Sequence, residues 1–390
     1  IHIDELLILT FTKAAAAEMK ERIRKKIKKE PTLQAELNKI DAAYITTFDS
    51  YALSIVKKYH YLLRIGKDVS IINQSLVNLK KEEYLDEIFE KYYQELLELN
   101  VGTILKDEPL YKHTTYRVGG PARLFIKVKD VEGLISIIKY CRKHRIQLFV
   151  IGRGSNLLFS DKSFEGIIIS LENMNHYSIN GSEVVAQSGV AMIKLAYDCA
   201  KVGLSGFEFM GGIPGNIGGG IFMNAGAYKS CLSEVVKSVK VLNENLRVVT
   251  LTKEEMEFSY RHSIIQDHPK WIVLEATFVL ENKSVEEINE TLDKRKERRM
   301  STQPWNKPSA GSVFRNPEGN AAWKLIDDAK LRGYEIGGAQ VSPKHSNFIV
   351  NNGYASAKDI YDLIFYVQKT VQEQSGVLLK PEVRFINWEL

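Results

Sequence analysis

Glycine is distributed very unevenly along this 390-residue chain, and that distribution limits what the chain can fold into. The chain holds 26 glycines, and Gly66 is the only one that precedes residue 99. Because glycine weakens helices and strands but permits turns with positive φ, we expect a helix-rich N-terminal part followed by a part with many tight turns. We place the boundary between residues 95 and 101, so that residues 1–98 form a separate segment.

Apolar periodicity indicates the elements of the N-terminal segment. Residues 3–11 have the composition of a short buried strand, and residues 14–29 have a helical apolar stripe that ends before Pro31. Two further helices are predicted over residues 50–63 and 75–99.

The second part has a different pattern, in which short apolar runs of strand type alternate with helical segments. The predicted strands lie within residues 124–128, 148–152, 166–170, 220–228 and 271–280. The predicted helices cover residues 131–144 and 191–202. This alternation is typical of an α+β fold.

Composition favours a globular protein that is not inserted in a membrane. The chain is 44% hydrophobic but has no run of about 18 consecutive apolar residues, and its first residues lack the pattern of a secretory signal. We therefore expect a cytoplasmic location. The three cysteines are far apart and have no metal-ligand spacing, so we expect no bound metal. The net charge of +5 is compatible with nucleotide diphosphates or nucleic acid as partners.

Three segments rich in glycine and small polar residues suggest a site for a large anionic cofactor. They span residues 114–121, 151–156 and 211–220. A pyrophosphate is bound by several backbone N–H groups at once, and glycine permits this close approach. The alternative is that these glycines form turns and bulges of a twisted sheet. They do not follow the strand-GxGxxG-helix pattern of a Rossmann site.

Six longer motifs turn this general expectation into a family resemblance. In chain order they are RVGGPA, IGRGSNLL, GFEFMGGIPGNIGGGIFMNAGAY, FSYRHS, SAGSVFRNP and LKPEVRF. Motifs of these types, in this order, resemble the UDP-N-acetylenolpyruvoylglucosamine reductases, the MurB family, over residues 101–387.

The resemblance implies an FAD-binding fold of the vanillyl-alcohol-oxidase type. Two α+β subdomains, over residues 101–300, would bind FAD, and residues 301–390 would form an α+β substrate-binding domain with a C-terminal catalytic strand. The implied cofactor-binding residues are Gly152, Arg153, Gly154, Ser155, Asn156, Gly212, Gly215, Asn216, Gly218, Gly219, Ala225 and Gly226.

The resemblance also implies a reaction, in which NADPH and FAD reduce UDP-N-acetylglucosamine enolpyruvate to UDP-N-acetylmuramate for peptidoglycan synthesis. Ser312 matches the proton donor, Arg261 matches the arginine that holds the substrate carboxylate, and Glu382 matches the glutamate that completes the enolate site. A planar guanidinium suits two carboxylate oxygens, and burial would raise the pKa of a glutamate that donates a proton.

Further substrate contacts are expected from Arg299, Arg315 and Asn316. Arg299 matches an arginine of family members that lack an inserted tyrosine loop, for which the sequence between residues 271 and 304 leaves no room. An alternative function is that of a flavin-dependent alcohol or sugar oxidase of the same fold.

The N-terminal segment resembles a different class of protein. LILTFTKAAAAEM and ITTFDS are similar to parts of the RecA-like core of AddA/UvrD-type DNA helicases. No GxxxxGK[ST] motif precedes them. We expect a partial, helicase-like fragment that neither hydrolyses ATP nor binds nucleic acid. A DNA-binding function of residues 1–98 is the second alternative.

Overall fold

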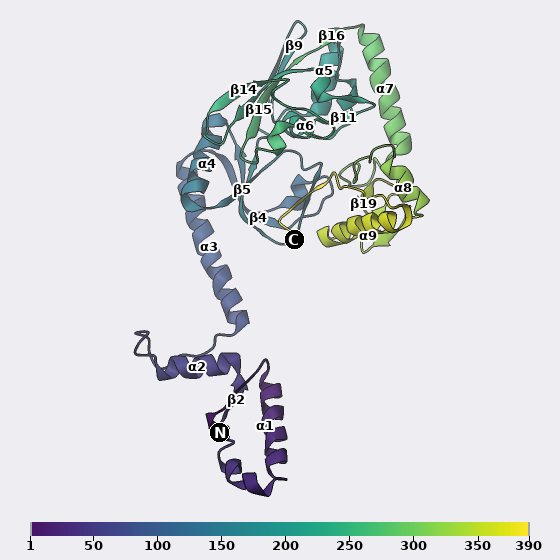
Figure 1. Cartoon of the computed structure of the whole chain (residues 1–390). Coiled ribbons are helices and arrows are strands. Elements are labelled where there is room, and N and C mark those ends of the chain that lie inside the picture. The colour runs from purple at the N-terminus through teal and green to yellow at the C-terminus, as the bar shows by residue number, and fades with distance from the viewer. Residues whose placement is uncertain (1, 389–390) are drawn as a thin grey trace. The chain divides into compact units, whose positions relative to one another are not determined.

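The computed structural model describes residues 2–388 and divides into two compact units, one up to Ile88 and one from Phe89 onward (Figure 1). The division falls inside helix α3 (Gln74–Glu98), about ten residues before glycine becomes frequent. The reason is packing within the second unit, because Phe89 and Leu96 are buried and Tyr92 contacts the ring of Tyr140 edge-on. Contacts of the last turns of α3 therefore set the division earlier than composition does.

The first unit has a small parallel sheet with two capped helices. Strand β1 (Leu7–Thr10) pairs with β2 (Tyr44–Thr47), and helices α1 (Lys13–Ile27) and α2 (Phe48–Lys58) each begin directly after one of the strands. The side chains of Thr12 and Thr47 accept hydrogen bonds from backbone N–H groups of the first turns. The expected buried strand is shorter than predicted and none of its residues is buried. A 3₁₀ turn at Ile3–Glu5 takes up part of the predicted span.

The first sheet of the second unit provides one edge of the site. Its order is β3-β4-β7-β5, in which β4, β7 and β5 are parallel and β3 is antiparallel to β4. The bounds are β3 Gly102–Pro109, β4 Pro121–Val128, β5 Gln147–Ile151 and β7 Phe164–Ser170, with helix α4 at Val131–His144. The carboxyl ends of the three parallel strands lie at one edge of the sheet, where loops of such sheets commonly bind ligands.

A second sheet is antiparallel and has the order β14-β13-β15-β9-β8. Its strands are β8 Tyr177–Asn180, β9 Glu183–Gln187, β13 Val236–Leu242, β14 Val248–Thr252 and β15 Ile272–Val279. The associated helices are α5 Met192–Lys201, α6 Ile217–Met223 and α7 Val285–Thr302. The apolar faces of this sheet, α5 and α6 form one core cluster.

One strand prediction in this region is wrong. Residues 220–228 were expected to be a strand, but helix α6 occupies Ile217–Met223, and only Gly226–Ala227 is extended, as β11. A Cβ on Gly218 would lie 2.9 Å from the Cβ of Ser188, and one on Gly220 would lie 2.9 Å from the Sδ of Met192. The glycines therefore let this short helix pack against its neighbours, which outweighs their low helix propensity.

The remaining elements form a third group near the C-terminus, with a core cluster of its own. They are α8 Ala322–Asp328, β17 Glu335–Ile336, β18 Ala339–Val341, β19 Ile349–Asn351 and α9 Ala357–Ser375. Strand β20 (Arg384–Ile386) then pairs in parallel with β6 (Leu157–Phe159). The short strands β10 Leu204–Ser205, β12 Ser230–Cys231 and β16 Glu281–Asn282 complete the set. The α+β class predicted from the sequence is confirmed.

Within residues 2–388, every helix is too short or too polar to cross a bilayer.

Candidate active site

A cavity of about 640 Å³ brings the predicted glycine-rich segments together at the carboxyl edge of the first sheet. It is lined by Lys112, His113, Thr114, Thr115, Gly152, Arg153, Glu172, Asn175, Gly189, Val190, Ala191, Lys194 and Asn216. All three segments that were singled out in the sequence contribute to this lining. The fold brings these distant segments together because strands β5 and β7 both end at the cavity and Asn216 forms a bridge with Ala191.

The chemistry of the cavity suits an anion. Lys112, Arg153 and Lys194 contribute positive charge, and Glu172 is the one acidic side chain in the lining. The Oγ1 atom of Thr115 is buried and has no hydrogen-bond partner within residues 2–388. A buried polar atom without a partner is costly unless a ligand or water satisfies it.

The predicted cofactor glycines differ in what surrounds them. A Cβ on Gly152 would meet only the Cβ of Asn216, at 3.9 Å, among the described atoms, and one on Gly219 would meet nothing within 4 Å. By contrast, a Cβ on Gly154 would collide with the backbone of His113, and one on Gly212 would lie 2.6 Å from Nη1 of Arg299. Packing alone therefore accounts for Gly154, whereas Gly212 abuts a movable arginine side chain and the space beside Gly152 opens into the cavity.

The predicted cofactor residues are thus partly assembled. Gly152, Arg153 and Asn216 line the cavity, and a Cβ on Gly215 would lie 3.7 Å from Oγ of Ser155, so two segments meet there. The others lie outside its lining and are Gly154, Ser155, Asn156, Gly212, Gly215, Gly218, Gly219, Ala225 and Gly226. Asn156 instead faces the C-terminal strand, where its Nδ2 donates to the carbonyl of Glu382 at 3.0 Å.

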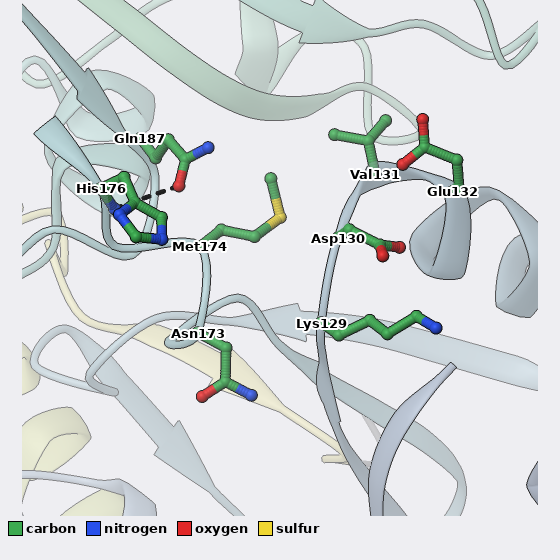
Figure 2. A pocket seen from close by; sticks show the side chains of 8 residues that line it. All are labelled: Lys129, Asp130, Val131, Glu132, Asn173, Met174, His176 and Gln187. Atoms are coloured by element: carbon green, nitrogen blue, oxygen red, sulfur yellow. Dashed lines mark hydrogen bonds between the residues drawn. The ribbon is translucent and has the colours of Figure 1, made fainter. Parts of the chain in front are cut away.

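A smaller cavity of about 360 Å³ lies between the loop that follows β4 and the loop that follows β7 (Figure 2). Lys129 and Asp130 line it from the first loop, Glu132 from the first turn of α4, and Asn173 and His176 from the second loop. Acidic and basic side chains are mixed here, and the Asp130 carboxylate is already used because it accepts from the backbone N–H of Gly133. This cavity has no set of groups that selects one ligand charge.

The three predicted catalytic residues come from three separate segments that the fold brings together. Residues 312–315 and 380–382 run antiparallel: Phe314 forms a bridge with Pro381, and the Glu382 N–H donates to the carbonyl of Val313 at 2.7 Å. Ser312 thereby lies one residue before Val313, whose carbonyl accepts from the Glu382 N–H. The two motifs are 70 residues apart in the sequence, and only this pairing makes them neighbours.

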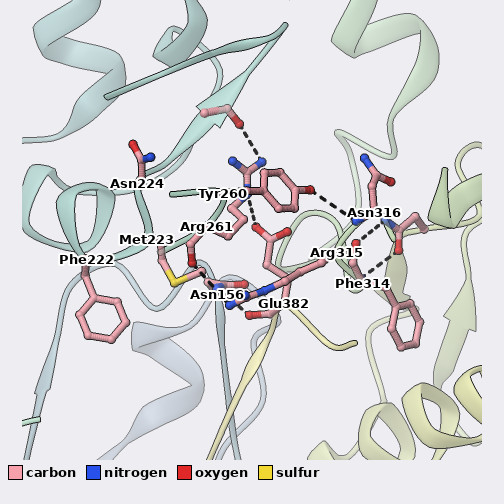
Figure 3. Close-up of polar contacts among 12 residues, drawn as sticks. Asn156, Phe222, Met223, Asn224, Tyr260, Arg261, Phe314, Arg315, Asn316 and Glu382 are labelled. Atoms are coloured by element: carbon pink, nitrogen blue, oxygen red, sulfur yellow. Dashed lines mark hydrogen bonds and ion pairs between the residues drawn. The ribbon is translucent and has the colours of Figure 1, made fainter. Parts of the chain in front are cut away.

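Arg261 connects Glu382 to strand β11 (Figure 3). Its Nε donates to Oε1 of Glu382 at 2.8 Å, and its Nη2 donates to the carbonyl of Gly226 at 2.9 Å. The guanidinium also lies over the ring of Tyr260, with 5.2 Å between Cζ and the ring centroid. These contacts fix the plane of the guanidinium, and within residues 2–388 no hydrogen bond is made by Nη1.

Burial changes the acidity of Glu382. Desolvation raises the pKa of this carboxyl above its usual range, although Arg261 and Arg315 act in the opposite direction. The side chain of Glu382 is 14% exposed. Burial therefore makes protonation of Glu382 more favourable than that of a surface glutamate.

The predicted substrate residues have different surroundings. Arg299 is partly buried beside Gly212 and Tyr228, and desolvation lowers its pKa. It pairs with no carboxylate in the described part of the chain. The Nε of Arg315 is also buried and lacks a partner among the described atoms. The Oδ1 of Asn316 accepts from the backbone N–H of Ala322 at 3.0 Å, so part of its side chain stabilises the start of α8.

Sequence reasoning missed a residue that supports Ser312. The side chain of Asn347 accepts from the N–H of Phe314 at 3.0 Å and donates to the carbonyl of Phe314 at 2.9 Å, and its own carbonyl accepts from the N–H of Val313. Asn347 is buried. A single asparagine in a sequence does not indicate a contact 33 residues away, so no local signal identifies this role.

Two family models match the second unit. One, described as "UDP-N-acetylenolpyruvoylglucosamine reductase, C-terminal domain", matches residues 303–386, and the other, "FAD binding domain", matches residues 122–252. The N-terminal hundred residues lie outside both matches.

Individual relatives are similar over most of the chain. The UDP-N-acetylenolpyruvoylglucosamine reductase of Anoxybacillus flavithermus is 46% identical over 298 residues, which are 76% of this chain and 99% of that protein. The reductase of Bacillus pumilus is 44% identical over 301 residues, with 77% and 99% covered. The crystal structure of the reductase from Thermus caldophilus has a TM-score of 0.62 and 32% identity, and covers 73% of this chain and 98% of that one.

The order of the motifs, the shared fold and this level of identity over nearly the full length of the relatives lead to one conclusion, which is that the chain belongs to the UDP-N-acetylenolpyruvoylglucosamine reductase family.

Proposed function

We propose that this chain uses FAD and NADPH to reduce UDP-N-acetylglucosamine enolpyruvate to UDP-N-acetylmuramate, a precursor of peptidoglycan. The observation that carries the proposal is the convergence of Arg261, Glu382 and the Ser312 segment. Residues 101–300 would form the FAD-binding part, with a vanillyl-alcohol-oxidase-type fold, and residues 301–390 the substrate-binding part.

The large cavity is compatible with FAD. Its positive lining, the unsatisfied hydroxyl of Thr115 and the open space beside Gly152 suit a dinucleotide whose pyrophosphate is approached by backbone N–H groups. Gly152, Arg153 and Asn216 would contact the cofactor directly. FAD, when bound, supplies hydride transfer between NADPH and the enolpyruvyl double bond.

Arg261 would bind the carboxylate of the enolpyruvyl group. Its Nε and Nη2 are occupied by Glu382 and Gly226, which leaves Nη1 to donate to the substrate. Negative charge develops on the carboxylate side of the double bond when hydride is added to the other carbon. A guanidinium that is already oriented stabilises this charge without reorganisation.

Ser312 would deliver the proton that quenches this charge. The transfer goes from Ser312 Oγ to the carbon that bears the carboxylate, and the hydroxyl must be held in place because it is a weak acid. Asn347 fixes the backbone of the next two residues, Val313 and Phe314. Glu382 keeps its proton more tightly than usual, and it would share that proton with an enolate oxygen.

Arg299 and Arg315 would contact the diphosphate or sugar of the substrate. A buried cation without a carboxylate partner is costly, and an anionic ligand removes this cost. Arg299 is partly buried and has no carboxylate partner within residues 2–388, and the unsatisfied Nε of Arg315 points to a further acceptor. Asn316 would donate from its side-chain NH₂ group, because its Oδ1 already accepts from the Ala322 N–H.

The proposed function is tested with the purified chain. We expect a flavin absorbance spectrum, and NADPH oxidation that requires the enolpyruvyl substrate and yields UDP-N-acetylmuramate. UDP-N-acetylglucosamine is the matched control, because it has the same nucleotide and sugar but lacks the enolpyruvyl group. A colourless protein that FAD does not reconstitute would contradict the proposal, and so would peroxide formation from alcohols or sugars, which indicates an oxidase.

We propose further that residues 1–98 are a helicase-like segment that does not itself hydrolyse ATP. The segment lacks a phosphate-binding GxxxxGK[ST] motif, and its sheet has two strands within the described residues. We expect no ATP hydrolysis with or without single-stranded DNA, and weak DNA binding at most. Tight binding that falls steeply with salt, and that is lost when these residues are deleted, would instead indicate a nucleic-acid function.

A further inference from the structure

The backbone of Arg261 has an unusual conformation for a non-glycine residue. Its φ is +57°, in the left-handed region, and Ser259 and His262 form a bridge on either side of it, with both N–H···O distances at 3.2 Å. A non-glycine residue in this region costs roughly 1 kcal/mol or more and persists when its surroundings hold it there. The contacts that hold this turn therefore decide where the guanidinium points.

Gln266 is the side chain that holds the carbonyl of Arg261. Its Nε2 donates to the Arg261 carbonyl at 3.0 Å and to the carbonyl of Phe222 at 2.8 Å. Only the NH₂ end of an amide can satisfy two carbonyl oxygens, so the orientation of this side chain follows from its partners. Arg315 adds a longer contact to the Arg261 carbonyl, at 3.4 Å.

The second partner of Gln266 ties the turn to helix α6. Phe222 lies in the last turn of α6, and its carbonyl also accepts from Oγ of Ser263 at 2.9 Å. Asn224, which follows the helix, donates from Nδ2 to the carbonyl of Ser259 at 2.9 Å. Helix α6 begins after Asn216, which lines the large cavity. One short helix thus connects the cavity wall to the Arg261 turn.

We infer that Gln266 is a positioning residue that orients Arg261 toward the substrate carboxylate by fixing the carbonyl of its left-handed turn against the end of α6. The inference rests on the proposed function, because it assumes that Arg261 binds that carboxylate. Gln266 itself is not expected to contact the substrate. Replacing Gln266 should therefore weaken binding only of ligands that carry the carboxylate.

Three substitutions at Gln266 differ in whether a hydrogen-bond donor is kept. Gln266→Met keeps the length of the side chain but removes the donor. Gln266→Glu places an acceptor against the two carbonyl oxygens. Gln266→Lys restores donors on a longer, flexible side chain, and is the conservative variant in this respect.

The first measurement is ligand binding by calorimetry to the FAD-loaded protein. We expect Gln266→Met to weaken binding of UDP-N-acetylmuramate, which carries a carboxylate, by about tenfold, and to leave binding of UDP-N-acetylglucosamine within about twofold. Gln266→Lys restores a donor but adds a charge close to the Arg315 guanidinium, so it should bind UDP-N-acetylmuramate more tightly than Gln266→Met does but less tightly than the unaltered chain does. Gln266→Glu should lose at least as much as Gln266→Met. The matched control is Gln340→Met, because Gln340 also donates to a backbone carbonyl, that of Gly333, at 3.4 Å.

The second measurement separates the two half-reactions in single turnovers. Reduction of the bound flavin by NADPH should be unchanged in Gln266→Met, whereas oxidation of the reduced protein by the enolpyruvyl substrate should slow by about tenfold to a hundredfold. Equal weakening of both ligands, equal loss in both half-reactions or binding like that of the unaltered chain would overturn the inference. If the unaltered chain itself does not turn over the enolpyruvyl substrate, the proposed function fails and the inference fails with it.

Discussion

Replacing Ser312 with alanine should slow oxidation of the reduced protein by the enolpyruvyl substrate by about 10²–10⁴-fold, the range typical of a lost general acid. Reduction of the bound flavin by NADPH should be unaffected, since that step needs no proton from this side chain. The reason for the large effect is positional. The segment that carries Ser312 is paired with Glu382 and held by Asn347, so water cannot take up the same place without reorganisation. Stopped-flow absorbance of the flavin measures both half-reactions.

Ser309→Ala is the matched control for this prediction. Ser309 lies three residues earlier in the same segment, and we assign it no part in the reaction. Its replacement should leave both half-reactions within about twofold of the unaltered chain, the size of effect expected from a surface change. If Ser312→Ala slows both half-reactions equally, or neither, Ser312 is not the proton donor and another group must supply the proton.

The second large effect is expected for Arg261→Lys, which should lower kcat/KM for the enolpyruvyl substrate by about 10²–10³-fold. The positive charge is kept, but one ammonium replaces a planar group whose Nε and Nη2 have fixed partners, Glu382 and Gly226. The single ammonium nitrogen of a lysine cannot occupy the places of Nε, Nη2 and Nη1 at once. It therefore cannot bind Glu382, the Gly226 carbonyl and the substrate together. Steady-state kinetics at several substrate concentrations would determine the change.

A control for charge alone is Arg247→Lys, which makes the same exchange at an exposed position before β14. This variant should behave as the unaltered chain does. An Arg261→Lys variant with kcat/KM within about threefold of the unaltered chain would mean that a point charge is sufficient there, and the role of the guanidinium plane would have to be abandoned.

Local sequence signals predicted the regular elements of the second unit well. The bounds of α4 agree with those predicted, because Asp130 caps its first turn, apolar residues recur at helical spacing and basic residues occupy its last turn. The same signals failed at α6, where glycine at three consecutive positions is unfavourable for a helix in isolation. Packing against Ser188 and Met192 decides the structure there, and a local pattern does not contain that information.

The candidate site was predictable only through the resemblance. Arg261 and Glu382 are 121 residues apart, and no spacing rule connects them, so only the resemblance assigned both to one site, and their direct contact was not predicted. Gln266, Asn224 and Asn347 were missed for a related reason. Each acts through hydrogen bonds to backbone atoms 33–44 residues away or in a turn of unusual φ, and amide side chains with such roles look like ordinary surface residues in the sequence.

The pairing of β20 with β6 has a consequence for how the protein acquires activity. Asn156 and Glu382 touch although 226 residues separate them, so the loop they close is among the longest in the second unit. Contacts of such high contact order form late in folding because the entropy of closing the loop is lost before they stabilise the chain. Secondary structure and the two core sheets should therefore recover before the flavin environment and the enzymatic activity do, and ligands that bridge the two strands should speed the final stage of refolding.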